Sequence, residues 1–160
     1  PEPESQDRPH RWRPFADVRR AAVSPDGRVT CVTRHLLPSD AQAALDRGAR
    51  TEQFLGLRPD VEGRPTFAYV WLAGSSPLIG RVEHRFDEGD PDHLDVTSFG
   101  EVDEPGGDWG PDSRHLSDDG YRHFESPEQA LEWAAVECEA PSDRWVNAGV
   151  IQDEYREAHG

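Results

Sequence analysis

The sequence contains no lysine, no methionine and only two cysteines. All seventeen basic side chains are therefore arginine, a bias that we attribute to the origin of the sequence rather than to a mechanism. Cys31 and Cys138 lie far apart and in no CxxC arrangement, so we expect two small buried hydrophobic side chains, with a disulfide between them as the alternative. No apolar run approaches the roughly 18 residues of a membrane span, and no leader-like segment occurs. We therefore expect a soluble, cytoplasmic protein that does not associate with membranes.

Hydrophobic residues are scarce at 34%, whereas charged residues make up 31% of the chain. Six Phe, five Trp and three Tyr nevertheless argue for a folded core rather than a disordered chain. A length of 160 residues favours one domain. Three prolines near the start predict a flexible arm over residues 1–14, followed by a single domain over residues 15–160.

Turn and capping residues predict the first elements of the domain. Two β-rich runs within residues 18–37 flank Ser24-Pro25-Asp26-Gly27, a sequence typical of the tight turn of a β-hairpin. A helix is then expected with Ser39 as its cap and Gln42 completing a capping box. Gly48 marks the end of that helix.

The middle of the chain predicts an antiparallel meander. After a short turn over residues 51–57, which places Phe54, Leu55 and Leu57 toward the core, the most apolar run predicts a central strand at 66–73. Partner strands follow at 78–86 and 93–102. The connections are too short for parallel crossovers, so the strands must run antiparallel.

The last third predicts a long surface loop at 103–119, a short strand at 121–124 and two helices. The first helix has Ser126 at its cap and Pro127 in its first turn, and one face carries Ala130, Leu131, Ala134, Ala135 and Cys138. The second helix spans the segment from Val150 to Ala158. The overall expectation is an α+β fold, with a mostly antiparallel sheet of four to six strands and about three helices.

Negative charge is concentrated in one stretch. The net charge of the chain is −15, and residues 87–119 hold twelve acidic residues against one arginine, whereas residues 1–58 hold eight against ten. We interpret this stretch as a surface that binds a basic protein partner, in the manner of an inhibitor, immunity-type protein or adaptor that imitates nucleic acid; a merely solvated loop is the alternative. The candidate partner-binding residues are Asp87, Glu88, Asp90, Asp92, Asp95, Asp103, Glu104, Asp108, Trp109 and Asp112.

The same charge argues against other partners. Binding to a nucleic acid backbone or to an anionic membrane needs basic side chains facing phosphate, so we expect neither. Three tryptophans, Trp12, Trp109 and Trp145, raise a further hypothesis, in which exposed indole rings attach the chain to a larger assembly.

A small enzyme or ligand-binding domain is the alternative to a protein-binding surface. Arg81, Glu83 and Arg85 share one face of an expected strand, with His84 between them, and such a polar face could bind an anionic small molecule; ion pairing is the simpler interpretation.

Catalytic and metal-binding patterns are missing. The acidic run from Asp87 has Gly89 and Pro91 where an EF-hand needs oxygen ligands, and no two histidines have helical zinc spacing. Cys31 and His35 share a strand face but are too far apart to hydrogen-bond directly. We therefore expect a non-enzymatic protein without a cofactor or metal.

Overall fold

The computed structural model describes residues 34–90, 92–93, 95–102, 117 and 119–160, together with the backbone of 21–23 and 29–31. The chain divides into two units, Pro1–Thr33 and Arg34–Gly160, and each is described by itself. In the first unit, β1 (Ala21–Val23) and β2 (Val29–Cys31) pair antiparallel, which confirms the expected hairpin. The arm expected at residues 1–14 and most of the loop expected at 103–119 lie outside the described residues.

The second unit is built on a five-stranded antiparallel sheet with the order β6-β5-β4-β3-β7. The strands are β3 (Arg50–Pro59), β4 (Pro65–Ala73), β5 (Leu78–Phe86), β6 (Arg122–Phe124) and β7 (Val146–Asn147). The apolar run that predicts a central strand is β4, in the middle of the sheet, and β5 matches its expected bounds. The expected α+β fold is therefore confirmed.

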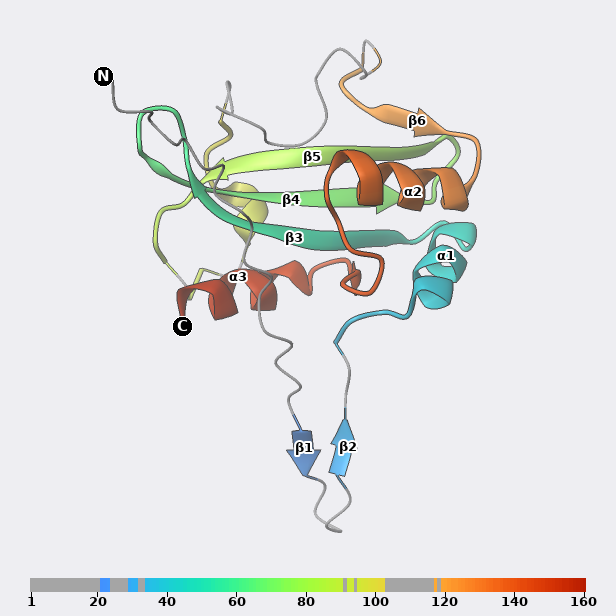
Figure 1. The fold of residues 1–160 in the computed structure, drawn as a ribbon, viewed down its shortest axis with the longest axis horizontal. Coiled ribbons are helices and arrows are strands. Elements are labelled where there is room, and N and C mark those ends of the chain that lie inside the picture. Colours follow the sequence, from blue (N-terminus) through green and yellow to red (C-terminus); the bar gives the residue numbers. More distant parts are fainter. Residues whose placement is uncertain are drawn as a thin grey trace, which may run out of the picture. The chain divides into compact units, whose positions relative to one another are not determined.

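Helices cover both faces of this sheet. On one face, α1 (Pro38–Asp46) and α2 (Pro127–Glu137) pack on Ala68, Val70 and Leu72 of β4. On the other, the 3-10 turn η1 (Val96–Ser98) and α3 (Ile151–His159) pack on Phe67, Tyr69 and Trp71 of the same strand. Figure 1 shows α2 lying over the strands and α3 running alongside β3. Alternate side chains of β4 thus supply two separate cores, one aliphatic and one aromatic.

The short turn expected at residues 51–57 is wrong, because this segment is part of β3. Its backbone pairs with β4 along its whole length, and the register shifts at a β-bulge between Phe54 and Gly56, where Gly56 has a φ of +119°. Before the bulge the strand alternates, so Phe54 contacts the aromatic core and Leu55 the aliphatic core. Leu57 is 37% exposed rather than turned inward.

The strand expected at 93–102 is also wrong. Asp95 accepts hydrogen bonds from the backbone N–H and the hydroxyl of Thr97 and thereby caps η1, and only an isolated bridge joins Glu101 to Arg85. Local turn bonds of this kind compete with a strand ladder. Val96 and Phe99 still reach the aromatic core, three residues apart on one side of the turn.

Of the two helix caps expected from the sequence, one is correct and one is wrong. The hydroxyl of Ser126 accepts from the backbone N–H of Gln129, 3.3 Å away, so the expected cap of α2 is confirmed. The expected cap of α1 is wrong: Leu37 precedes the helix, Pro38 opens it, and no side chain caps it. Proline at the first helical position removes one of the donors that a cap would satisfy.

Three side chains test the expected distribution of apolar residues between core and surface. Ala135 is exposed, although the helical pattern predicts it on the buried face of α2. Cys138 is buried with a free thiol, which fits a small hydrophobic residue and not a disulfide. Trp145 is only 1% exposed, so it packs in the core and offers no surface for an assembly. Among the helices of the described residues, none is both long and apolar enough to span a bilayer.

Candidate functional site

Carboxylates and guanidinium groups lie in different parts of the folded unit. Among the residues whose side chains the structure describes, seventeen aspartates and glutamates are exposed but only three arginines, Arg47, Arg64 and Arg156. The exposed acids are Asp40, Asp46, Glu62, Glu88, Asp90, Asp92, Asp95, Glu101, Asp119, Glu125, Glu128, Glu132, Glu137, Glu139, Asp143, Asp153 and Glu157. The described surface is therefore strongly anionic.

Five of the less exposed arginines pair with buried acids, namely Arg34, Arg50, Arg81, Arg85 and Arg144. Four acidic residues are buried, and each forms an ion pair with at least one arginine: Glu52 with Arg50, Asp60 with Arg64, Glu83 with Arg81 and Arg85, and Glu154 with Arg34 and Arg144. A buried carboxylate without such a partner would lose its hydration without compensation. Arginine therefore neutralises acids inside the fold and contributes little to the outer surface.

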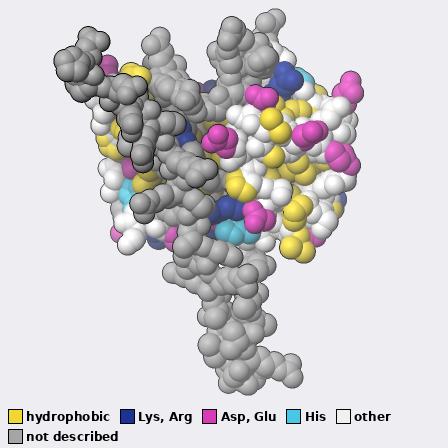
Figure 2. Space-filling model, viewed as in Figure 1, with side chains coloured by type: hydrophobic (Ala, Val, Ile, Leu, Met, Phe, Trp, Pro, Cys, Tyr) yellow, Lys and Arg dark blue, Asp and Glu magenta, His cyan; other side chains and the backbone are white. Residues whose placement is uncertain are grey.

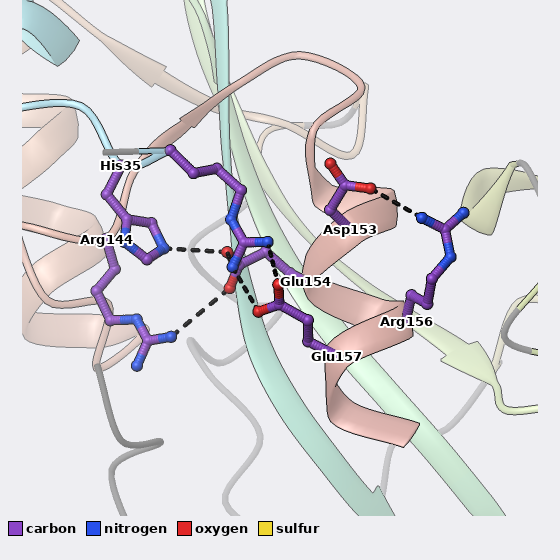
Figure 3. A network of polar contacts seen from close by, with 7 residues as sticks. His35, Arg144, Asp153, Glu154, Arg156 and Glu157 are labelled. Carbon is purple, nitrogen blue, oxygen red and sulfur yellow. Dashed lines mark hydrogen bonds and ion pairs between the residues drawn. The ribbon is translucent and has the colours of Figure 1, made fainter. Parts of the chain in front are cut away.

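The largest of these internal clusters surrounds Glu154 of α3 (Figure 3). Its carboxylate accepts from the guanidinium of Arg34 at 2.6 Å and contacts His35 Nε2 at 3.0 Å and Arg144 at 3.6 Å. Arg34 also binds both carboxylate oxygens of the neighbouring Glu157, at 2.9 and 2.8 Å. Burial alone would lower the pKa of Arg34, but the hydrogen bond to Glu157 and the charge of Glu154 raise it.

This cluster joins three distant segments rather than presenting a reactive group. Glu154 is 7% exposed and its oxygens are already occupied by cations from both ends of the unit. His35, a sequence candidate for catalysis, is one of those partners, and the side chain of Cys31 lies outside the described residues. We interpret the cluster as a clamp between α3 and the segments that precede α1 and β7.

The charged side chains on the polar face of β5 pair with one another. Arg81, Glu83 and Arg85 do share a face, and the Glu83 carboxylate lies 3.5 Å from Arg81 and 3.1 Å from Arg85. It also accepts a hydrogen bond from Nε1 of Trp71 at 3.1 Å. An anionic ligand at this face would have to displace Glu83 from both arginines. These contacts are the ion pairs that we gave as the simpler interpretation.

His84 does not belong to that polar face. Strand alternation puts it on the side of Val82, which packs against the aliphatic core. Burial lowers the pKa of His84 to about 4, so its imidazole is neutral at pH 7. The three residues of the predicted ligand site are therefore not brought together.

A cavity of about 230 Å³ lies between the start of β3, η1 and the start of α3, and Arg50, Glu52, Asp95, Thr97, Gly149 and Gln152 are among the residues that line it. Its charged groups are already engaged. The guanidinium of Arg50 pairs with Glu52 and lies 4.4 Å from the Trp71 ring centroid, while Glu52 also accepts from the N–H of Gly149. The charged side chains Arg50 and Glu52, which line the cavity, therefore already pair within the protein and are not available to a ligand.

One serine and one histidine are in contact. His93 Nε2 lies 2.6 Å from the hydroxyl of Ser98, an arrangement that the sequence pattern did not indicate. The hydroxyl of Ser98 donates to the carbonyl of Asp95, so His93 donates to Ser98 rather than accepting its proton. This is the reverse of what a general base needs. Both side chains stabilise the turn around η1.

The predicted partner-binding residues fall into three groups. Asp87 turns inward: its side chain is 9% exposed and accepts from the hydroxyl of Tyr155 at 2.6 Å and from His159 at 3.0 Å. Exposed acids are Glu88, Asp90, Asp92 and Asp95. The rest lie outside the described residues, namely Asp103, Glu104, Asp108, Trp109 and Asp112.

A second acidic region lies on α2 and the residues beside it. The comparison of charges in residues 1–58 and 87–119 did not reveal this region. Residues 123–143 contain six acidic residues and no arginine, and all six are exposed. Figure 2 shows acidic side chains around a band of hydrophobic atoms on the face that carries α2. Counting arginines together with acids in a shorter window would have found this region in the sequence.

Within the described residues, no three histidine, cysteine or acidic side chains gather as a metal site would require. Comparison with protein-family models, curated proteins and solved structures finds no match to this chain. Its function must therefore be argued from its own residues.

Proposed function

We propose that the chain is a non-enzymatic, cytoplasmic interaction protein whose acidic surface binds a basic protein partner, as an inhibitor, immunity-type protein or adaptor does. One observation carries the proposal: seventeen exposed carboxylates face solvent against three exposed arginines in the described residues, while five of the other arginines pair with buried acids. Basic groups on a partner would supply the neutralisation that the fold does not.

The expected mechanism is electrostatic attraction of a polycation. A surface of one sign raises the association rate with a partner of the opposite sign, and the effect decreases as salt increases. Carboxylates at such a surface can occupy the sites that phosphates would fill, so the chain would compete with nucleic acid for the same basic partner. Because the surface is crowded with like charge, a partner also relieves repulsion among the acids.

A synthetic arginine-rich peptide tests the proposal without knowledge of the natural partner. Stopped-flow fluorescence with a labelled peptide should show association at about 0.15 M ionic strength, where charges interact over roughly 8 Å, and slower association as salt increases. A single-stranded oligonucleotide should compete with the chain for the peptide. A matched peptide with glutamine in place of arginine should not bind.

Neutralising the first acidic region should weaken this association through the on-rate. The variant with Asp90, Asp92, Asp103 and Asp108 changed to asparagine removes four charges, and we expect association to slow by about threefold with little change in dissociation. If wild type failed to bind the arginine-rich peptide, or bound it equally at all salt concentrations, the proposal would be wrong.

A small-molecule function has less support. Glu83 is held by Arg81 and Arg85, and His84 lies on the opposite face, so no described group at that position is poised for an anion.

A further inference from the structure

The outer face of α2 carries a stripe of six residues that point away from the sheet. Ala130, Trp133 and Ala134 face the aliphatic core, and the opposite side of the helix and its two flanks are exposed. Members of the stripe recur three or four residues apart, which is the spacing of one helix face. We call this set the α2 stripe: Glu125, Glu128, Glu132, Ala135, Val136 and Glu139.

The acids of the α2 stripe other than Glu125, which Arg122 precedes by three residues, have no arginine within four residues in the sequence. Glu128 receives a hydrogen bond from Gln42 of α1, a neutral donor, and residues 123–143 contain no basic residue other than His123. Glu128 and Glu132 repel each other as like charges four residues apart on a helix. Glu139 lies just beyond the negative end of the helix dipole, where acids are unfavourable. Glu128 lies in the first turn of α2, at the positive end of the dipole, where an acid is favourable. The unfavourable contributions therefore come from Glu132 beside Glu128 and from Glu139.

Apolar atoms lie among these acids. Val136 is 68% exposed, Ala135 beside it is exposed, and Leu131 on the flank is half-buried. Leu37, at the start of the neighbouring helix α1, is 66% exposed. Figure 2 shows the resulting band of hydrophobic atoms over α1 and α2, with acidic side chains on both sides. Val136 and Leu37 are two of the four large hydrophobic side chains that are exposed among the described residues.

We propose that the α2 stripe docks a cationic amphipathic α-helix of a protein partner. This inference deepens the proposed function and rests on it. Basic side chains of the partner helix, three or four residues apart, would face Glu128, Glu132 and Glu139, and an aliphatic side chain would pack on Val136. The stripe spans fifteen residues, of which the eleven of α2 are helical and about 16 Å long, with Glu125 before the helix and Glu139 after it, so a partner helix of about four turns covers it.

Charge selects this occupant over the other candidates. Nucleic acids and anionic membranes have the same sign as the stripe and would be repelled. A second copy of the chain would bring two acidic stripes together. An extended polycation would satisfy the acids but leave Val136 in water, whereas a helix with basic and aliphatic residues on one face covers both.

The test compares two labelled peptides of four helical turns and identical composition. One places arginines and leucines on a single helical face, and the other has the same residues scrambled. Fluorescence anisotropy gives the affinity of each for wild type and for two triple variants of equal charge change. The first variant carries Glu128→Gln, Glu132→Gln and Glu139→Gln, and the control carries Asp46→Asn, Glu62→Gln and Asp153→Asn, at exposed positions outside both acidic regions.

We expect wild type to prefer the amphipathic peptide, and the α2 variant to bind it about tenfold more weakly, as the loss of three charge pairs implies, while the control loses less than about threefold. Val136→Ser should weaken binding a further ~3-fold without changing the salt dependence. Circular dichroism checks that each variant is folded.

Three outcomes would contradict the inference. If the two triple variants lost affinity equally, net charge alone would account for binding, and the proposed function would stand without the α2 stripe. If both peptides bound equally well, or Val136→Ser bound like wild type, the amphipathic occupant would be wrong. If wild type bound no basic peptide at low salt, the proposed function would fail together with the inference.

Discussion

The two helices on opposite faces of the sheet use the same acidic side chains in opposite ways. In α3, Glu154 and Glu157 are paired with arginine from another part of the chain, and the helix packs on the aromatic core. In α2, Glu128 and Glu132 are exposed and form no ion pair with the part of the chain that the structure describes, while alanines and Trp133 pack on the aliphatic core. Acidic residues thus stabilise the fold at α3 and leave an unneutralised surface at α2.

This difference follows from where arginine is placed. A chain with seventeen arginines and thirty-two acidic residues can neutralise only part of its negative charge internally. The described arginines near α3 and β5 pair with buried carboxylates, where an unpaired charge would be most costly. The excess acids must then be exposed, and α2 carries a large share of them. The comparison predicts that substitutions on the α3 side destabilise the fold, whereas those on the α2 side do not.

The largest effect is expected from Glu154→Ala. Removing this carboxylate leaves Arg34 and Arg144 without their buried counter-charge, so the free energy of unfolding should fall by about 3–5 kcal/mol. Urea denaturation measures the change. Glu157→Gln, at a more exposed partner of the same Arg34, should lose less than about 1 kcal/mol and serves as the control. Similar losses in the two variants would mean that Glu154 is not the centre of the clamp.

His84 lies on the aliphatic side of the sheet and makes stability depend on pH. The folded pKa of about 4 lies below the ordinary 6.5, so as pH falls the unfolded chain takes up the proton first. Stability present above pH 6.5 should therefore decrease as pH falls toward 4, by up to about 3 kcal/mol at roughly 1.4 kcal/mol per unit of pKa.

Urea midpoints measured between pH 7 and 4 test this dependence. His84→Gln should flatten the decrease in acid, whereas Ser142→Ala, at an exposed position that does not titrate, should keep the wild-type curve. A His84 imidazole that titrates near its ordinary pKa by NMR would contradict the prediction.

A smaller effect is expected where α3 meets Asp87. Tyr155 is fully buried and its hydroxyl donates to Asp87, so Tyr155→Phe should lower the free energy of unfolding by about 1–3 kcal/mol, the range for a hydrogen bond to a charged group. Tyr121→Phe, at a half-buried ring, is the control. Combining Tyr155→Phe with Asp87→Ala should give less than the sum of the two losses, and strict additivity would show that the two side chains do not interact.

Sequence patterns predicted the parts of the fold that local chemistry determines. The apolar run of β4, the cap and proline of α2 and the apolar spacing of α3 each specify their element without help from distant residues. β3 escaped prediction because its bulge at Gly56 hides the alternation, and because pairing with β4 stabilises it. Capping by Asp95 likewise replaced an expected strand with a turn.

The candidate sites were less accessible to sequence reasoning. Glu154 meets Arg34 from more than a hundred residues away, and no local pattern indicates such a pair. The inward turn of Asp87 toward Tyr155 is hidden for the same reason, so a residue that looked like surface charge is a hydrogen-bond acceptor in the core. The acids of the α2 stripe, in contrast, can be found in the sequence, because they recur at helical spacing in a segment that contains no arginine. The structure shows these acids exposed, as their position on the helix opposite the apolar residues predicts.

The smallest effect, and the one of opposite sign, is expected at α2. Changing Glu132 and Glu139 to glutamine removes one i, i+4 repulsion and one acid at the negative end of the helix dipole, and it leaves Glu128 in its favourable place in the first turn of α2. The free energy of unfolding should therefore rise by about 0.5–1 kcal/mol at low salt. Because salt screens these charges, the gain should shrink at about 1 M salt, where the screening length is near 3 Å. Urea denaturation at low and high salt measures both values. A loss of stability would show that the stripe contributes to folding, as the acids of α3 do, and would remove the contrast between the two helices.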